Sequence, residues 1–176
     1  MALVSALGFS QTKTAFVNFS ELVQLMPQMD TVRSVINASQ KEGAEAYKEM
    51  EDEFNSKYQT YQAKVASWPA SLRESKEKEL TELQQRIQEF AQNFQSDLQQ
   101  QQQALMAPVY NKAQQVVENL AKAGGYAVVY DKVSVLYIDP AQCADLTEAA
   151  RKALGIPEGR TLETLQAELQ AAAAQE

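Results

Sequence analysis

Apolar residues recur at steps of three and four along a long stretch of the chain, from about residue 28 to residue 123. Such spacing places them on one face of a helix and is typical of a coiled-coil seam. The first stripe comprises Met29, Val32, Ile36, Gly43, Tyr47, Met50, Phe54, Tyr61, Val65 and Trp68, and the second runs from Leu72 to Val109. The pattern therefore predicts two long amphipathic helices.

A short break separates the two stripes. Pro69 would cost about 3 kcal/mol inside a helix, because it removes a backbone donor and clashes with the preceding turn. Ser71 and Glu74 have the spacing of a capping box, so a new helix is expected to start there. Two long helices joined by a short break form an antiparallel hairpin. At about 1.5 Å per residue, about 40 residues in each leg make an arm of roughly 60 Å. Pro108 should kink the returning helix or mark a break between two helices.

Short β-prone runs lie on either side of the long helices. Residues 12–19 predict a strand, and Asn18 and Glu21 have the spacing of a helix cap directly after it. Residues 126–131 and 133–138 predict two further strands that form a hairpin around a tight turn. One strand and one hairpin together make a sheet of three strands.

Two short helices are expected near the end of the chain. Asp145 should cap the first, which ends near Leu154, and Thr161 should cap the second, which is amphipathic. The whole pattern predicts a mainly α protein with a small β head, in the α+β class. In this fold a long antiparallel helical-hairpin arm projects from a β-rich oligomerisation body.

The predicted division of the chain follows these zones. Residues 12–27 and 106–156 form a discontinuous β-rich assembly body, residues 28–105 form the arm, and residues 157–176 form a C-terminal amphipathic helix extension. Residues 1–11 are apolar and rich in small residues but contain no basic residue. They are interpreted either as a signal-peptide remnant or as a disordered leader.

A sheet of only three strands has open edges and little core, so it should be marginal on its own. We therefore expect several copies to pool their strands into a closed barrel or prism, with one arm leaving per chain. The alternative is a monomer in which the final helices cover the sheet.

Composition removes most catalytic chemistry. The 176 residues include no histidine and a single cysteine, Cys143, which excludes the usual histidine-based nucleophile pairs, an internal disulfide framework and a cysteine-rich zinc site. Asp139 and Asp145 flank Cys143, but Asp145 is explained as a helix cap and Cys143 as a partly buried small residue. The net charge of -7 argues against nucleic-acid binding. We expect no enzyme, no metal and no cofactor.

The arm carries the candidate binding surface. Seven of the fourteen aromatic residues lie on it, and glutamines give the returning helix a neutral, amide-rich face. Exposed aromatic surface bordered by polar residues binds unfolded chains adaptably, whereas the same rings can instead be buried in the seam. The candidate contacts are Tyr58, Tyr61, Trp68, Phe90 and Phe94.

The order of strand, long helical hairpin, paired strands and short capped helix resembles the OmpH/Skp family of periplasmic chaperones. The head and re-entry segments carry the resemblance, and the arms match in length and pattern only. These segments are Lys13–Asn18, Leu105–Lys112, Gly125–Asp131, Val135–Tyr137 with Asp139, and Asp145–Thr147. The match covers roughly residues 13–156.

The resemblance implies a homotrimer whose arms enclose a cavity. It also implies an ATP-independent holdase in the periplasm, which binds unfolded outer-membrane proteins and delivers them toward the outer-membrane assembly machinery. The best-known members are basic and this chain is acidic, so no membrane or lipopolysaccharide contact is carried over. The segment 157–176 extends beyond the family pattern.

A function of another class is a structural or adaptor coiled coil that binds one defined folded partner. It predicts indifference to unfolded chains, whereas a holdase predicts that unrelated unfolded chains compete for the same arms.

Overall fold

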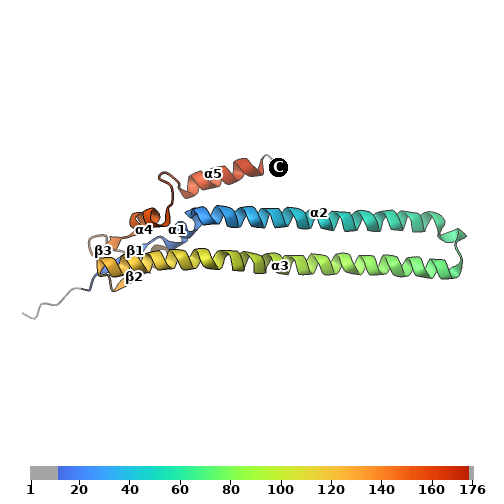
Figure 1. The fold of residues 1–176 in the computed structure, drawn as a ribbon, viewed down its shortest axis with the longest axis horizontal. Helices are drawn as coiled ribbons and strands as arrows, with labels where there is room; N and C mark the ends of the chain where they lie inside the picture. Colours follow the sequence, from blue (N-terminus) through green and yellow to red (C-terminus); the bar gives the residue numbers. More distant parts are fainter. Residues whose placement is uncertain (1–11, 175–176) are drawn as a thin grey trace, which may run out of the picture. The chain divides into compact units, whose positions relative to one another are not determined.

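The computed structural model describes residues 12–174, and the predicted leader lies outside the described residues (Figure 1). β1 (Thr14–Val17) is the central strand of a three-stranded sheet with the order β2-β1-β3. Its neighbours β2 (Val128–Asp131) and β3 (Cys143–Asp145) both pair with it in parallel. Ala15, Phe16 and Val17 are buried, as a central strand requires.

The predicted β-hairpin of residues 126–138 is wrong. Its first half forms β2, but the chain then turns through a short 3-10 helix, η2 (Lys132–Ser134), and the next described strand is β3. Asp131 Oδ1 accepts hydrogen bonds from the backbone N–H groups of Val133 (3.4 Å) and Phe19 (3.3 Å). These bonds hold the turn at the end of β2, so residues 133–138 do not fold back along it.

The helix after β1 begins where the sequence predicts. In α1 (Phe19–Leu25), Asn18 Oδ1 accepts a hydrogen bond from the backbone N–H of Glu21 at 3.4 Å. The Glu21 carboxylate accepts from the Asn18 side-chain amide at 2.6 Å. The backbone N–H of Asn18 donates instead to Thr147 Oγ1 at 3.2 Å, so the two helix starts are tied together.

The described residues of Met1–Asp30 and Met106–Glu176 form one compact unit, and those of Thr31–Leu105 form a second. The first unit contains the sheet and α1, α4 (Thr147–Leu154) and α5 (Leu162–Ala173). Its apolar core is built from Ala15, Phe16, Val17, Leu22, Val23, Leu25, Met26, Met29, Val109, Ala113, Leu146, Ala150, Leu154, Ile156 and Leu165.

The second unit is the predicted antiparallel hairpin, formed by parts of α2 (Pro27–Lys64) and α3 (Ala70–Gly124). The short helix η1 (Val65–Ser67) and Pro69 join them (Figure 1). The predicted cap is displaced, because α3 already begins at Ala70 and Ser71 lies within its first turn. The carbonyl of Pro69 accepts from the N–H groups of the first turn instead. α3 continues through Pro108.

No helix in the part of the chain that the structure describes is both long and apolar enough to cross a membrane.

Candidate binding surfaces

The five aromatic residues predicted as contacts lie along the hairpin, four of them in two pairs and the fifth paired with Phe54. Tyr61 and Trp68 meet edge to face, with ring centroids 6.0 Å apart, close to the hairpin turn. Tyr58 stacks on Phe54 at 6.0 Å. Phe90 and Phe94 stack on each other at 5.6 Å, nearer the middle of the hairpin. The rings are therefore distributed along a surface and do not form one closed pocket.

Exposure separates these aromatic residues. Tyr58 is 43% exposed, whereas the other four are half-buried. Tyr61 also donates its hydroxyl hydrogen to Glu77 Oε1 at 2.5 Å, and this bond raises the pKa of Tyr61. Tyr58 is thus the ring with the most free surface, in agreement with its position beside the apolar stripe. That these five residues contact unfolded chains stays a prediction.

The middle of the hairpin depends on a close approach between its two helices. Gly43 is buried, and a Cβ atom at this position would overlap the ring of Phe94. A groove of about 510 Å³ lies beside this contact and is lined partly by Phe90 and Leu98. The glycine therefore makes room for an aromatic ring from the opposite helix.

Gly43→Ala is expected to lower the free energy of unfolding by about 1–2 kcal/mol, because overlap with Phe94 outweighs the better helix propensity of alanine. In a Phe94→Ala background the same change should stabilise the hairpin by up to about 1 kcal/mol. Urea unfolding followed by the fluorescence of Trp68, the single tryptophan, measures both. If Gly43→Ala changed the free energy of unfolding in the same direction in both backgrounds, the packing of Phe94 on Gly43 would be contradicted.

Charged residues tie the two helices together nearer the turn. Glu79 of α3 accepts hydrogen bonds from Lys57 of α2 and, at 2.7 Å, from Lys76 of its own helix. Lys57 also lies 3.4 Å from Glu53. These bonds lower the pKa of Glu79 to about 2 and raise that of Lys57.

The lowered pKa of Glu79 gives this cluster a defined pH dependence. An unpaired glutamate titrates near pH 4.3, so the stabilisation is complete above that pH and is lost as the pH falls toward 2. Glu79→Gln should therefore reduce the melting temperature modestly at pH 7 and much less at pH 2, where a large part of the carboxylate is protonated.

Glu82→Gln is the matched control, since Glu82 is 63% exposed and lies 3.7 Å from Lys78. Calorimetry at the two pH values compares both variants. A Glu79→Gln effect of the same size at pH 2 as at pH 7 would mean that the carboxylate charge is not its cause.

A second apolar surface lies in the first unit. Val133, Leu136 and Tyr137 are the most exposed large hydrophobic residues of the described chain, at 67%, 109% and 77%. All three lie within six residues after β2. Isolated exposed apolar residues are ordinary, but a concentrated group indicates an interaction surface.

The sheet beside this segment is also incompletely covered. Val128 and Tyr130 of β2 are 41% and 44% exposed. Along β2 runs an apolar groove of about 330 Å³, whose walls include Val17, Phe19, Val117, Ala121, Val129 and Tyr130. Parallel sheets normally have both faces covered and their edges paired or protected. The described chain therefore leaves this part of the sheet open to a partner.

Sequence reasoning missed this surface because it counted residues 133–138 as a paired strand. An alternating β-prone run has the same composition whether it pairs with its own chain or with another. The expectation that several copies pool their strands was the only signal that pointed toward it.

The acidic and thiol groups have structural roles. Asp145 Oδ1 accepts a hydrogen bond from the backbone N–H of Thr147, the first residue of α4, at 2.8 Å. The capping position of α4 is Leu146, however, so the predicted cap at Asp145 is displaced by one residue. Cys143 is half-buried in β3, as predicted. Among the described residues no group of three or more histidine, cysteine, aspartate or glutamate side chains could hold a metal ion.

Comparisons with known proteins agree on one family. Residues 13–154 match the family described as "Outer membrane protein (OmpH-like)". The chaperone protein Skp of Yersinia enterocolitica is 28% identical over 81% of this chain and 87% of its own length. The Skp protein of Pectobacterium atrosepticum is 29% identical over 77% and 81%.

The fold is also similar to a solved structure. A Caulobacter crescentus protein, described as an OmpH-like outer membrane chaperone, superposes with a TM-score of 0.71. The match covers 88% of this chain and 90% of that protein at 16% identity, so it supports the fold alone. The family match spans most of the chain, and the chain therefore belongs to the OmpH/Skp family of chaperones, which are not enzymes.

Proposed function

We propose that this protein is an ATP-independent holdase of the periplasm that binds unfolded outer-membrane proteins in a cavity between the arms of a homotrimer. It prevents their aggregation during transit and releases them toward the outer-membrane assembly machinery. The observation that carries the proposal is the group of exposed apolar residues at 133–137 beside an incomplete sheet, in a chain of this family.

The first unit supports the association of several copies of the chain. Three parallel strands leave β2 and β3 each paired with β1 alone among the described strands, and the adjacent segment exposes Leu136 and Tyr137. Packing this segment against β2 of a neighbouring copy would bury apolar surface on both chains. A closed ring of copies would remove the open edges altogether.

The second unit supports the binding of an unfolded client. Its aromatic rings are half-exposed and are separated by polar side chains, so they offer many weak contacts in place of one specific pocket. Between residues 41 and 89 there are eight basic and eleven acidic residues, which limits strong ionic attachment of either sign. Distributed weak contacts suit an unfolded chain that must later be released.

Light scattering of the protein alone, and then with a urea-denatured outer-membrane β-barrel protein diluted into it, tests both parts. The expected result is a particle of three chains that keeps one client in soluble form. A single-chain particle contradicts assembly, and a trimer that leaves the client to precipitate contradicts the holdase activity and favours a folded partner.

Variants locate the client contacts. Tyr58→Ser with Trp68→Ser should weaken client retention without changing the mass of the particle. The matched control is Leu162→Ser with Leu169→Ser, which removes two apolar side chains, 41% and 44% exposed, from α5. Equal retention by the two double variants would remove these rings from the binding surface.

A further inference from the structure

The C-terminal segment lies outside the family match, which ends at residue 154. Within the first unit it forms a loop and then α5, which starts with a reciprocal cap. Thr161 Oγ1 accepts from the backbone N–H of Thr164 at 3.2 Å, and Thr164 Oγ1 accepts from that of Thr161 at 2.8 Å. Leu165 is 5% exposed, and α5 contacts α1. The segment is thus a folded part of the unit.

The loop before α5 fixes the position of Arg160. Gly155 ends α4 in the left-handed conformation (φ 72°), and Gly159 has a φ of 81°. Residues other than glycine rarely adopt such positive φ values. The N–H of Arg160 donates to the carbonyl of Pro157 at 3.2 Å, which closes the turn. The conformation of the loop backbone therefore fixes the position of Arg160 relative to α4.

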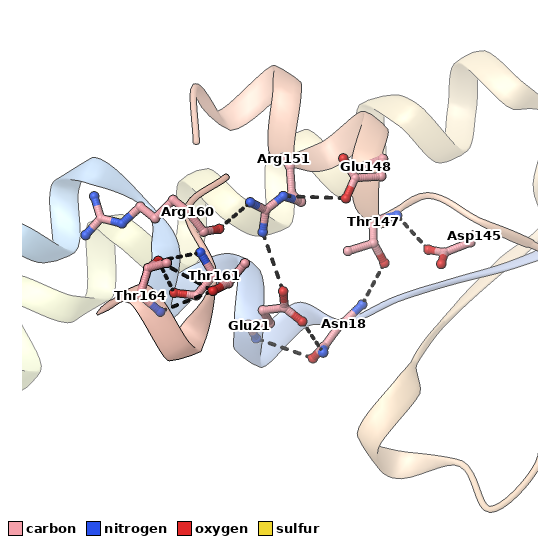
Figure 2. A network of polar contacts seen from close by, with 9 residues as sticks. All are labelled: Asn18, Glu21, Asp145, Thr147, Glu148, Arg151, Arg160, Thr161 and Thr164. Carbon is pink, nitrogen blue, oxygen red and sulfur yellow. Dashed lines mark hydrogen bonds and ion pairs between the residues drawn. The ribbon is translucent and has the colours of Figure 1, made fainter. Parts of the chain in front are cut away.

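Two arginines connect this loop to the rest of the unit, and Figure 2 shows the contacts of the first, Arg151. Arg151 of α4 donates through Nη2 to the backbone carbonyl of Arg160 at 2.5 Å and through Nη1 to Glu21 Oε1 of α1 at 3.5 Å. Only 11% of the Arg151 side chain is exposed. α4, α1 and the loop are thereby held by one guanidinium group.

Arg160 makes the link to α2. Its Nη1 and Nη2 donate to the two carboxylate oxygens of Asp30 at 2.7 and 2.5 Å. The arginine side chain is 13% exposed and the aspartate 48%. A bidentate, partly buried pair within a network is the kind of ion pair that contributes measurably to stability.

The position of Asp30 gives this pair its significance. Asp30 lies in the first turn of α2 and is the last residue of the first unit, since the second unit begins at Thr31. The chain passes between the units only here and at residues 105 and 106 of α3. Close to that second passage, Pro108 lacks the N–H that would bind the carbonyl of Ala104. The connection between the units at Asp30 is thus reinforced by side chains, whereas the connection at residues 105 and 106 lies close to a missing helix hydrogen bond.

We propose that residues 157–174 act as a strap, which ties the first turn of α2 to α1 and α4 through Arg160 and so restricts the movement of α2 where it enters the second unit. This inference goes beyond the holdase function, because it concerns a segment that the family match does not include. The strap thereby limits the movement of α2 at the point where the chain passes from the first unit to the second.

Hydrogen exchange of the full-length, assembled protein tests the strap. In Arg160→Met, the backbone amides of residues 31–36 should exchange roughly tenfold faster, because a charged hydrogen-bonded pair between this turn and the loop is lost. The amides of β1 and those around Leu83 should keep their rates. Arg160→Lys should give exchange rates between those of the natural protein and those of Arg160→Met. Lysine keeps the positive charge but cannot donate to both carboxylate oxygens through a planar guanidinium group.

Lys152→Met is the matched control, because it removes one positive charge from the exposed side of α4. Asp30→Asn tests the pair from its other side, and it should raise the same local rates without adding to the effect of Arg160→Met. Rates at residues 31–36 equal to those of the control would overturn the strap. So would an equal increase in β1, because it would indicate general destabilisation.

Discussion

The Leu136→Asp variant is expected to behave as a single chain in solution, and not as the trimer that we propose for the natural protein. Leu136 is fully exposed, at 109%, so its replacement removes no buried surface within its own chain. A charge placed in an apolar contact between copies would be buried without a partner, which costs several kcal/mol per site. A closed ring contains the contact once per copy, so the losses accumulate.

Sedimentation or light scattering at micromolar concentration measures the mass, and thermal unfolding should lose its dependence on protein concentration. Leu169→Asp is the matched control, since Leu169 is 44% exposed on α5 and should leave the mass unchanged. A Leu136→Asp protein with the mass of three chains would show that residues 133–137 do not form the contact between copies.

The second large effect is expected inside the hairpin. Leu83 is 1% exposed, and it is the only large side chain in the described part of the second unit that is this deeply buried. Truncation of a buried leucine to alanine removes transfer free energy and leaves a cavity, at a cost of about 2–5 kcal/mol. Leu83→Ala should therefore lower the urea midpoint of the hairpin substantially.

Leu72→Ala provides the control, because Leu72 lies on the same helix with 38% of its surface exposed. It should cost well under half as much. The fluorescence of Trp68, close to the hairpin turn, reports on both variants. Equal shifts in the two would mean that the hairpin is not held together at Leu83.

Local patterns were sufficient for the long helices. The three- and four-residue spacing of apolar residues is read over many turns, so single errors do not change the result, and Pro69 allows only one place for the break. The cap at Asn18 was also predictable, because its hydrogen bonds span three residues. The displaced start of α3 is an error of the size that helix ends commonly show.

The sheet could not be derived in the same way. Thr14 pairs with Val128 on one side and with Cys143 on the other, and no local signal encodes contacts over such separations. Residues 133–138 have the composition of a strand, yet Val133, Leu136 and Tyr137 among them are left exposed in the described chain. Similarly, the apolar stripe included Gly43 without revealing that the ring of Phe94 fills the space above it.

By itself, the sequence determined that this protein has two long helices joined at a proline, a small β head and no catalytic chemistry of the usual kinds. These properties follow from backbone geometry and from side-chain types within a few residues of one another. Only the tertiary structure decided that the sheet is parallel, that Leu136 and Tyr137 are exposed, and that Arg160 meets Asp30. Each of these depends on residues more than a hundred positions apart or on surface left uncovered, and the free energy of such contacts exists only once the chain has folded.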